Sequence, residues 1–138
     1  MQASGAKIRV EDVALGRDKS VLLNSKDLVR DAVVQMSEKH LGFACIIDDQ
    51  DKLIGVFTDG DLRRVLLAEH KPLAALFAED IGMHMTENPK RVNSDMELAD
   101  AVAFMESADI YDLPVVDKQD RIIGLLHMHT ALKHLLGL

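Results

Sequence analysis

The chain has 138 residues, 48% of them hydrophobic, which is enough for one globular domain with a core, or for two very small ones. Its net charge of −7 argues against a nucleic-acid-binding or anionic-membrane-binding face, since both need concentrated basic residues. The single cysteine, Cys45, excludes a disulfide framework and a cysteine-based zinc site. No apolar run approaches the ~20 residues of a bilayer-spanning helix, and we expect a cytoplasmic protein.

The predicted elements begin after a short polar leader. Residues 1–7 are interpreted as a disordered leader or a remnant of cloning. Residues 20–23 predict a short strand, and Ser25 is the candidate N-cap of a helix that ends near residue 39. That helix has apolar residues at positions 29, 32, 33 and 36, which lie on one helical face. Strands over 43–47 and 52–57, joined by a polar turn, predict an antiparallel hairpin, followed by a helix over 59–68.

An internal repeat organises the rest of the chain. A shift of 69 residues superposes residues 24–67 on 93–136 without gaps and gives 13 identities over those 44 positions. Among the identical pairs are Ile54-Gly55 with Ile123-Gly124 and Asp31 with Asp100. A duplicated unit of this kind predicts two similar motifs packed about a pseudo-two-fold axis, because two copies are too few for a solenoid.

The second copy predicts the same order of elements. Residues 90–92 form a short strand, and Ser94 with Glu97 predicts a capping box for a helix that ends near residue 108. A hairpin over 113–126 and a final helix over 128–136 follow. The fold class is therefore α+β, with two tandem βαββα motifs over 8–68 and 81–138. The connector over 69–80 has Leu73, Leu76 and Phe77 at helical spacing, and we expect it to pack on the motifs.

The duplicated unit resembles a CBS-domain pair, also called a Bateman module. The stretch Gly55-Val56-Phe57-Thr58-Asp59-Gly60-Asp61 fits the nucleotide-contact pattern of that family. The longer run over 55–64, the segment 80–89 and the residues 126–129 are similar to the C-terminal CBS pair of bacterial D-arabinose 5-phosphate isomerases. Those enzymes serve the synthesis of Kdo, an acid sugar of lipopolysaccharide. Their catalysis resides in a sugar-isomerase (SIS) domain, so the resemblance implies a regulatory role for this chain and no enzymatic activity of its own.

The residues quoted for the resemblance have side chains suited to a nucleotide. An ionised Asp61 can accept hydrogen bonds from both ribose hydroxyls. Thr58, at the junction of strand and helix, lies where the helix dipole favours a phosphate. Gly55 and Gly60 would allow close backbone approach, and Asp59 and Arg63 complete this part of the predicted site. The predicted slot for the base is lined by Val21, Leu23, Cys45 and Ile46.

Two alternatives stay open for these residues. Thr58-x-x-Asp61 is also a capping box, so both residues can serve only to start a helix. Cys45 lies in an apolar run and also fits a buried small hydrophobe. In the second copy, His127 and Thr130 stand opposite Thr58 and Asp61, so a ribose site organised like the first is not expected there. His127 and His129 are candidate donors to a phosphate or carboxylate, and no metal site is expected.

The function expected from the resemblance is regulation of a sugar-phosphate isomerase by a bound nucleotide or nucleotide sugar. Because of the position of that enzyme in its pathway, CMP-Kdo or CMP is favoured, and AMP or ATP is the alternative ligand. The expected partners are an SIS domain and a second CBS pair, in a homodimer within a tetrameric parent. A module that only mediates oligomerisation, without a ligand, is the alternative from another class.

Overall fold

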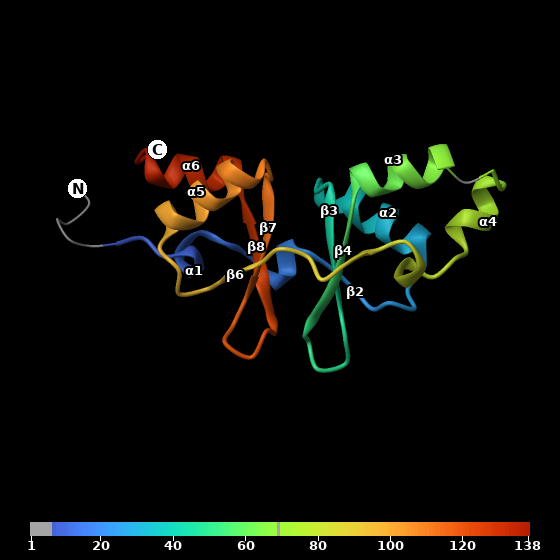
Figure 1. The fold of residues 1–138 in the computed structure, drawn as a ribbon, viewed down its shortest axis with the longest axis horizontal. Helices are drawn as coiled ribbons and strands as arrows, with labels where there is room; N and C mark the ends of the chain where they lie inside the picture. Colours follow the sequence, from blue (N-terminus) through green and yellow to red (C-terminus); the bar gives the residue numbers. More distant parts are fainter. Residues whose placement is uncertain (1–6, 69) are drawn as a thin grey trace.

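The structure, a computed structural model, describes residues 7–68 and 70–138. It consists of two four-stranded sheets that lie side by side, with helices above them and hairpin turns below in the view of Figure 1. The expected disordered leader lies, apart from Lys7, outside the described residues. Lys7 itself is exposed, and its Nζ lies 3.0 Å from Oε1 of Glu97.

The first motif has the predicted order of elements. Its sheet has the order β2-β3-β4-β5, in which β2 is parallel to β3 and the β3–β4 pair is antiparallel. The apolar hairpin strands and the apolar stripe of the first helix were placed correctly because both patterns are local. The elements are β2 (Val21–Leu23), α2 (Val29–Lys39), β3 (Phe43–Ile47), β4 (Leu53–Thr58) and α3 (Asp59–Ala68).

The second motif repeats this arrangement. Its sheet has the order β1-β8-β7-β6, with β6 parallel to β7 and an antiparallel β7–β8 hairpin. Both hairpins change register after their fourth pair, at Ile46/Ile47 and at Val115/Val116. The elements are β6 (Val92–Asn93), α5 (Leu98–Ala108), β7 (Asp112–Val116), β8 (Ile122–His127) and α6 (Met128–Leu135).

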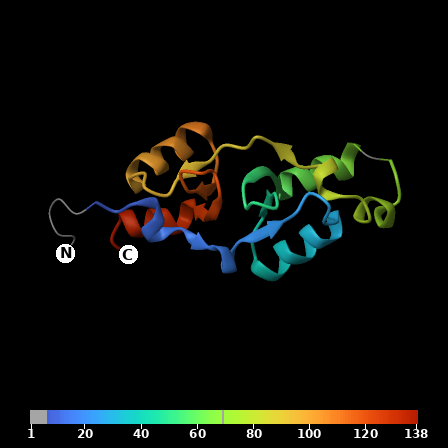
Figure 2. The ribbon, with the colours of Figure 1, turned by 90° about the horizontal axis from the view of Figure 1, so that it is seen from below.

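One strand of each sheet comes from a segment outside its own motif. The segment before the first motif joins the sheet of the second motif, and the segment before the second motif joins the sheet of the first. We name residues 8–16 the N-terminal arm and residues 79–87 the central arm. The N-terminal arm carries α1 (Val10–Val13) and β1 (Leu15–Gly16), and β1 pairs with β8 of the second motif. The 3-10 helix η1 (Arg17–Lys19) follows it. The central arm carries η2 (Ile81–Met83) and β5 (Thr86–Glu87), and β5 pairs with β4 of the first motif. Figure 2 shows the blue N-terminal arm beside the red second motif.

The two arms make the same backbone hydrogen bonds to the motifs they cover. The equivalent bonds, donor first, are Val10 N to Met96 O and Ile81 N to Asp27 O, Glu11 N to Ser94 O and Gly82 N to Ser25 O, and Leu98 N to Ile8 O and Val29 N to Glu79 O. A shift of 71 residues relates Ile8 to Glu79, whereas the motifs repeat at 69 residues. The repeat therefore extends into the arms, and the change of register hides it from a comparison at one fixed shift.

The predicted helix starts at Ser25 and Ser94 are wrong. The N-caps lie three residues later, at Leu28 and Glu97, and the helices begin at Val29 and Leu98. The first N–H group of each helix donates to a carbonyl of an arm, Val29 to Glu79 and Leu98 to Ile8. Because the free N–H groups of a helix start need acceptors, a distant segment has taken the role assigned to the serine side chains.

The apolar core has three parts. One lies within each motif, and each contains a fully buried residue from an arm, Ile81 in the first motif and Val10 in the second. The third lies between the two sheets and joins the motifs. Its buried members come from both motifs and are Cys45, Ile47, Leu53, Val56, Val116 and Ile122.

The connector forms a short helix, α4 (Leu73–Phe77). Leu76 is buried and Phe77 packs against the first core, as predicted, but Leu73 is 54% exposed because it lies on the outer side of α4. Across residues 7–68 and 70–138, no helix combines the length and apolar character needed to cross a membrane.

Candidate functional site

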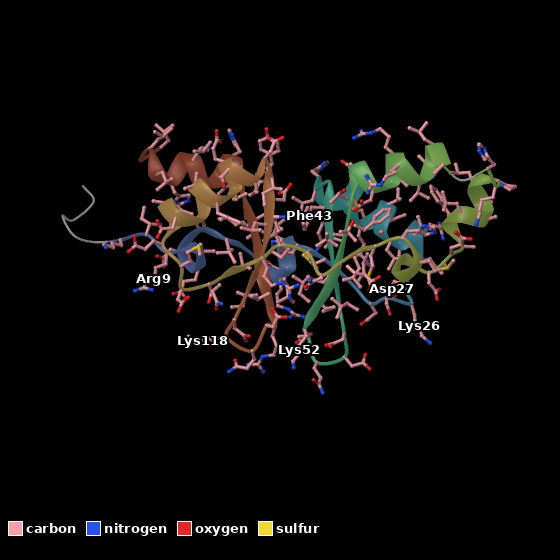
Figure 3. The ribbon with its side chains drawn as sticks, viewed as in Figure 1. Arg9, Lys26, Asp27, Phe43, Lys52 and Lys118 are labelled. Atoms are coloured by element: carbon pink, nitrogen blue, oxygen red, sulfur yellow. The ribbon has the colours of Figure 1, made fainter. Side chains whose placement is uncertain are left out.

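A cavity of about 330 Å³ opens between the two motifs. Its size lies within the range of small-molecule pockets. The first motif contributes the side chains of Phe43, Val56, Thr58 and Asp61. The central arm contributes Thr86, and the residues directly after it contribute Asn88, Pro89 and Lys90. The second motif contributes Ile110, Asp112, Leu113 and Pro114. Figure 3 shows Phe43 at the side of the first motif that faces the second.

Thr58 and Asp61 form a capping box at the start of α3. The Thr58 N–H donates to Oδ2 of Asp61 at 2.9 Å, and the Asp61 N–H donates to Oγ1 of Thr58 at 3.1 Å. The structural role is therefore present, and both residues also line the cavity. A cap of this kind contributes about 1 kcal/mol to the stability of a helix.

The Asp61 side chain is only 6% exposed, and its carboxylate has two further partners. Its Oδ1 accepts hydrogen bonds from Nη2 of Arg64 and from Oγ1 of Thr86, the latter at 3.3 Å. The Arg64 side chain is exposed, so it can leave Oδ1 with little loss of packing. A carboxylate offers about four acceptor positions. Three of them are used here, and a ligand would have to displace Arg64 or Thr86 to engage Oδ1 fully.

The other predicted site residues between positions 55 and 63 do not share one environment. The sequence predicted that a ligand would approach the backbone at Gly55, but the central arm lies against this glycine instead. A Cβ at Gly55 would be 2.5 Å from Sδ of Met85. Gly60 faces looser surroundings, with Thr58 Oγ1 at 3.5 Å from the position of a Cβ. Asp59 lines a different cavity of about 380 Å³ next to α2, together with His40 and Gly42. Asp59 thus points away from Asp61, and Arg63 is exposed on α3.

The side chains predicted to form the base slot lie elsewhere. Val21, Leu23 and Ile46 are buried in the core of the first motif, and Cys45 is buried in the core between the sheets. None of these four residues lines the cavity of Thr58 and Asp61. Strand β3 alternates between its two faces, and the cavity is lined by Phe43 at the start of the strand, whose side chain the apolar pattern alone did not single out.

Burial also determines the chemistry of the one thiol. Burial, with a smaller contribution from the negative charge of Asp112, raises the pKa of Cys45 to about 12. This is the behaviour of a buried small hydrophobe, the alternative that the sequence favoured for this residue.

The second motif has a different polar pair at the equivalent position. His127, opposite Thr58 in the repeat, places Nδ1 2.7 Å from Oδ1 of Asp112. The two residues are direct cross-strand neighbours on β7 and β8. His129 is exposed on α6. Within the described ranges, no group of three or more His, Cys, Asp or Glu side chains is arranged to hold a metal ion.

Most cavity residues that sequence reasoning missed come from the second motif, from the central arm and from the residues directly after that arm, and Phe43 of the first motif was missed as well. The repeat contains a signal for some of them, because the 69-residue shift places Asp112 opposite Phe43. A pseudo-two-fold axis brings these equivalent strand starts toward one another. The segment 80–89 was noted only for its resemblance to the isomerase CBS pair. No signal placed Thr86, Asn88, Pro89 or Lys90 at a cavity, since their position depends on the path of the central arm between the two motifs.

The comparison with protein families decides the membership of the chain. The model of the CBS domain matches twice, over residues 10–68 and 78–137. The chain belongs to the CBS domain family. Each match contains one of the two βαββα motifs of the observed fold, so the α+β pair of motifs that the sequence predicted is confirmed.

Solved CBS-pair structures have the same architecture. The crystal structure of CBSX2 in complex with AMP is 27% identical, with a TM-score of 0.81, and covers 94% of this chain and 97% of that one. A second structure of CBSX2, from Arabidopsis thaliana, is 26% identical with a TM-score of 0.80 and covers 96% of both chains.

Curated relatives include enzymes with a CBS-sized match. The arabinose 5-phosphate isomerase KdsD of Salmonella typhimurium is 34% identical over 128 residues, which are 91% of this chain and 37% of that protein. The KdsD protein of Francisella tularensis is 31% identical over 126 residues, again 91% of this chain and 37% of the relative. An uncharacterised Chlamydia pneumoniae protein is 35% identical, over 96% of this chain and 40% of its own length. The chain thus spans 40% or less of these relatives.

Proposed function

We propose that this CBS pair is a regulatory module that senses a nucleotide or nucleotide sugar in the cavity between its motifs. The observation that carries the proposal is the nearly buried Asp61 carboxylate on the wall of an inter-motif cavity of about 330 Å³. The AMP complex of CBSX2, which shares this fold at 27% identity, supports a nucleotide as the ligand.

In this proposal the two ends of the cavity bind different parts of the nucleotide. The ribose hydroxyls donate to Asp61 after Arg64 has turned away. The phosphate lies near the start of α3, close to Thr58 and the Lys90 ammonium group, where the helix dipole favours an anion. The base lies among the apolar side chains of Phe43, Val56, Ile110 and Leu113, which replace the slot that the sequence predicted.

The contacts of Asp61 suggest how binding is transmitted. Thr86, which donates to Asp61, belongs to the central arm that joins the two motifs. A ligand that donates to Asp61 in place of Thr86 would break the hydrogen bond between Asp61 and Thr86. The first motif would then bind the central arm less tightly. A ligand regulates only if it binds the two resulting arrangements unequally.

The similarity to KdsD supports a parent protein in which an SIS isomerase domain is the partner of this module. In that setting CMP-Kdo, an activated product of the pathway of lipopolysaccharide synthesis, is the favoured ligand, with CMP as its smaller analogue. AMP and ATP are the alternative ligands, supported by the AMP complex of CBSX2.

The test is isothermal titration of AMP, ATP, CMP and CMP-Kdo into the wild-type chain and Asp61→Asn. Asparagine keeps an oxygen for the cap but loses the charge, so we expect the affinity for the preferred ligand to fall about tenfold. Asp100→Asn, at an exposed carboxylate in the first turn of α5, is the matched control and should bind like wild type. Absence of binding by all four ligands would refute the sensor function, and equal binding by Asp61→Asn would refute the role of Asp61.

A second function, oligomerisation, is favoured by apolar side chains that the fold leaves uncovered. Helices α3 and α6 lie along the same edge of the molecule (Figure 1). Their exposed leucines include Leu66 and Leu67 on α3 and Leu132 and Leu135 on α6, and Leu67 is 77% exposed. We propose that this helical edge pairs two copies of the chain, since apolar surface of this kind is stabilised by burial.

Light scattering on the wild type and Leu67→Glu tests this pairing. The wild type should have the mass of a dimer and the variant that of a monomer. Lys26→Glu is the control that should stay dimeric, because Lys26 is exposed and lies on the lower side in Figure 3, away from this helical edge. A monomeric wild type would contradict the pairing. A dimer that ignores all nucleotides would favour a purely structural module.

A further inference from the structure

Asp112 is an acidic side chain on the apolar side of the cavity, and sequence reasoning assigned it no role. It lines the cavity together with Ile110, Leu113 and Pro114, and its side chain is 20% exposed. The negative charge of Asp112 contributes to the raised pKa of Cys45, so the carboxylate acts across the interface on strand β3 of the first motif. A charged acceptor therefore lies among the surfaces best suited to hold a planar base.

The two carboxylates of the cavity differ in the acceptor positions that they have left. Three protein groups donate to Asp61. Asp112 accepts one hydrogen bond, from Nδ1 of His127 to Oδ1. Its Oδ2 accepts none from any residue within 7–68 and 70–138. Oδ2 is not fully buried, so water can reach it in the free chain. A ligand that donates an N–H group to Oδ2 would replace that water and form a charge-assisted hydrogen bond at the wall of the cavity.

His127 determines how the Asp112 carboxylate is presented. The two residues are paired across the β7–β8 hairpin, so Oδ1 is held at the strand pair and the carboxylate cannot rotate freely. The first motif has Phe43 and Thr58 at the equivalent pair and offers no carboxylate there. The pair is therefore a feature of one side of the cavity only.

We propose that Asp112, positioned by His127, selects nucleotides whose base presents an exocyclic amine, such as cytosine and adenine. The amine donates to the carboxylate, as carboxylates do when they read the N4 amine of cytosine. Uracil and hypoxanthine place a carbonyl oxygen where these bases have the amine, and two acceptors that face each other repel. The inference rests on the proposed nucleotide site and adds the base selectivity of that site.

Two matched pairs of ligands test the inference, CMP with UMP and AMP with IMP, because each pair differs by an amine replaced by a carbonyl. In titration calorimetry the wild type should bind the amine-bearing member about tenfold more tightly or better. In Asp112→Asn the amide can turn its NH₂ group toward a carbonyl, so the preference should fall to about twofold or less. Asparagine still accepts a hydrogen bond from His127, and circular dichroism should confirm the fold.

Asp109→Asn is the matched control. Asp109 lies shortly before Asp112, accepts a hydrogen bond from the Tyr111 hydroxyl at 3.4 Å, and does not line the cavity. Its positive φ of 55° is one that asparagine tolerates. This variant should keep the preference of the wild type.

The outcomes separate the inference from the function on which it rests. A wild type that binds both members of a pair equally would overturn the role of Asp112 while the nucleotide site stands. So would an Asp112→Asn variant that keeps the full preference, or one that loses affinity for both members equally, since that would place Asp112 against the sugar. A wild type that binds none of the four nucleotides would overturn the proposed function itself, and this inference with it.

Discussion

Cys45 illustrates, at the scale of a single residue, how burial determines reactivity. Its pKa of about 12 means that far less thiolate is present near neutral pH than for a thiol with the ordinary pKa of 9.0. At pH 8 we expect the native chain to react with a thiol reagent such as DTNB about a thousandfold more slowly than the unfolded chain. Stopped-flow absorbance with and without urea measures both rates. Rapid labelling of the native protein would contradict the buried position.

Glu79 links the pH dependence of stability to the central arm. Its carboxylate lies 2.6 Å from Nζ of Lys71 and 2.8 Å from Nε2 of His84, and hydrogen bonds from Lys71 and then His84 lower its pKa below the ordinary 4.5. A lowered pKa in the folded state means that the contribution to stability is present above pH 4.5 and is lost as the pH falls further.

The corresponding test compares Glu79→Gln with wild type by urea unfolding at several pH values. The variant should be less stable than the wild type at pH 7, and the two stabilities should converge toward pH 3 because the wild-type carboxyl is then protonated. Glu38→Gln, an exposed position on α2, serves as the control for loss of a negative charge. If the difference in stability between Glu79→Gln and wild type were the same at every pH, the ionisation of Glu79 would not be a source of the pH dependence of stability.

At the scale of elements, the arms explain two glycines of the repeat. Gly55 on β4 and Gly124 on β8 are equivalent, and each is the point where an arm strand pairs with a motif strand. A Cβ at Gly124 would collide with the backbone carbonyl oxygen of Leu15. At Gly55 the nearest atom belongs to the Met85 side chain, which can move, although Thr86 O also lies 3.1 Å from the Cβ position.

We therefore expect Gly124→Ala to be the more damaging of the two alanine substitutions. It should reduce the free energy of unfolding by about 1–3 kcal/mol or more, because the backbone of β1 must shift or detach. Gly55→Ala should cost less, and Gly60→Ala, in the first turn of α3 where a Cβ fits, should be neutral or stabilising. Thermal or urea unfolding measures all three. If Gly55→Ala lowered the free energy of unfolding most, the backbone of β1 would adjust to an added methyl group more easily than the Met85 side chain does.

The elements themselves divide into those that local patterns predict and those that they do not. The β3–β4 hairpin and the ends of α2 and α5 follow from apolar spacing and polar turns within a few residues. The starts of α2 and α5 do not, because Glu79 and Ile8, which accept their first hydrogen bonds, lie far away in the sequence. The strands β1 and β5 are too short for any periodic pattern and exist because a sheet edge accepts them.

At the scale of the whole molecule, two arginines hold the motifs together near the hairpin turns. Nη1 of Arg91 lies 2.8 and 2.7 Å from the two carboxylate oxygens of Asp120 and also donates to Leu53 O. Arg17 approaches the opposite pair, donating to Ile122 O and, at 3.3 Å, to Asp51. Each arginine thus contacts both motifs. Backbone bonds from Leu53 N to Asp120 O and from Ile122 N to Asp51 O complete the contact.

The two arginines should contribute unequally to stability. Arg91→Lys removes the planar group that donates to Asp120 and Leu53, and we expect a loss of about 1–2 kcal/mol. Arg17 and Asp51 are both more exposed and make a longer contact, so Arg17→Lys should cost about 0.5 kcal/mol or less. Urea unfolding of the two variants gives both values. Equal effects would argue that the exposure of these pairs does not control their strength.

The candidate site shows the same division between local and distant information. Thr58 and Asp61 are recognisable because strand, cap and helix are consecutive in the sequence, and the structure retains their cap on the wall of the cavity. The predicted neighbours Val21, Leu23 and Ile46 were chosen for apolarity alone, and apolarity does not distinguish the face of a strand that meets the core from the face that meets a cavity.

By itself, the sequence determined the duplication, the βαββα order of each motif and the position of the residues that start α3, because identity at a fixed shift, apolar periodicity and capping are all local properties of the chain. Only the tertiary structure decided that each arm crosses to the other motif, where the two helices begin, and which side chains Asp61 shares a cavity with. Those features depend on hydrogen bonds and packing between segments that are distant in sequence. A sheet edge or a helix start has no periodic sequence pattern that indicates which distant segment will pair with it.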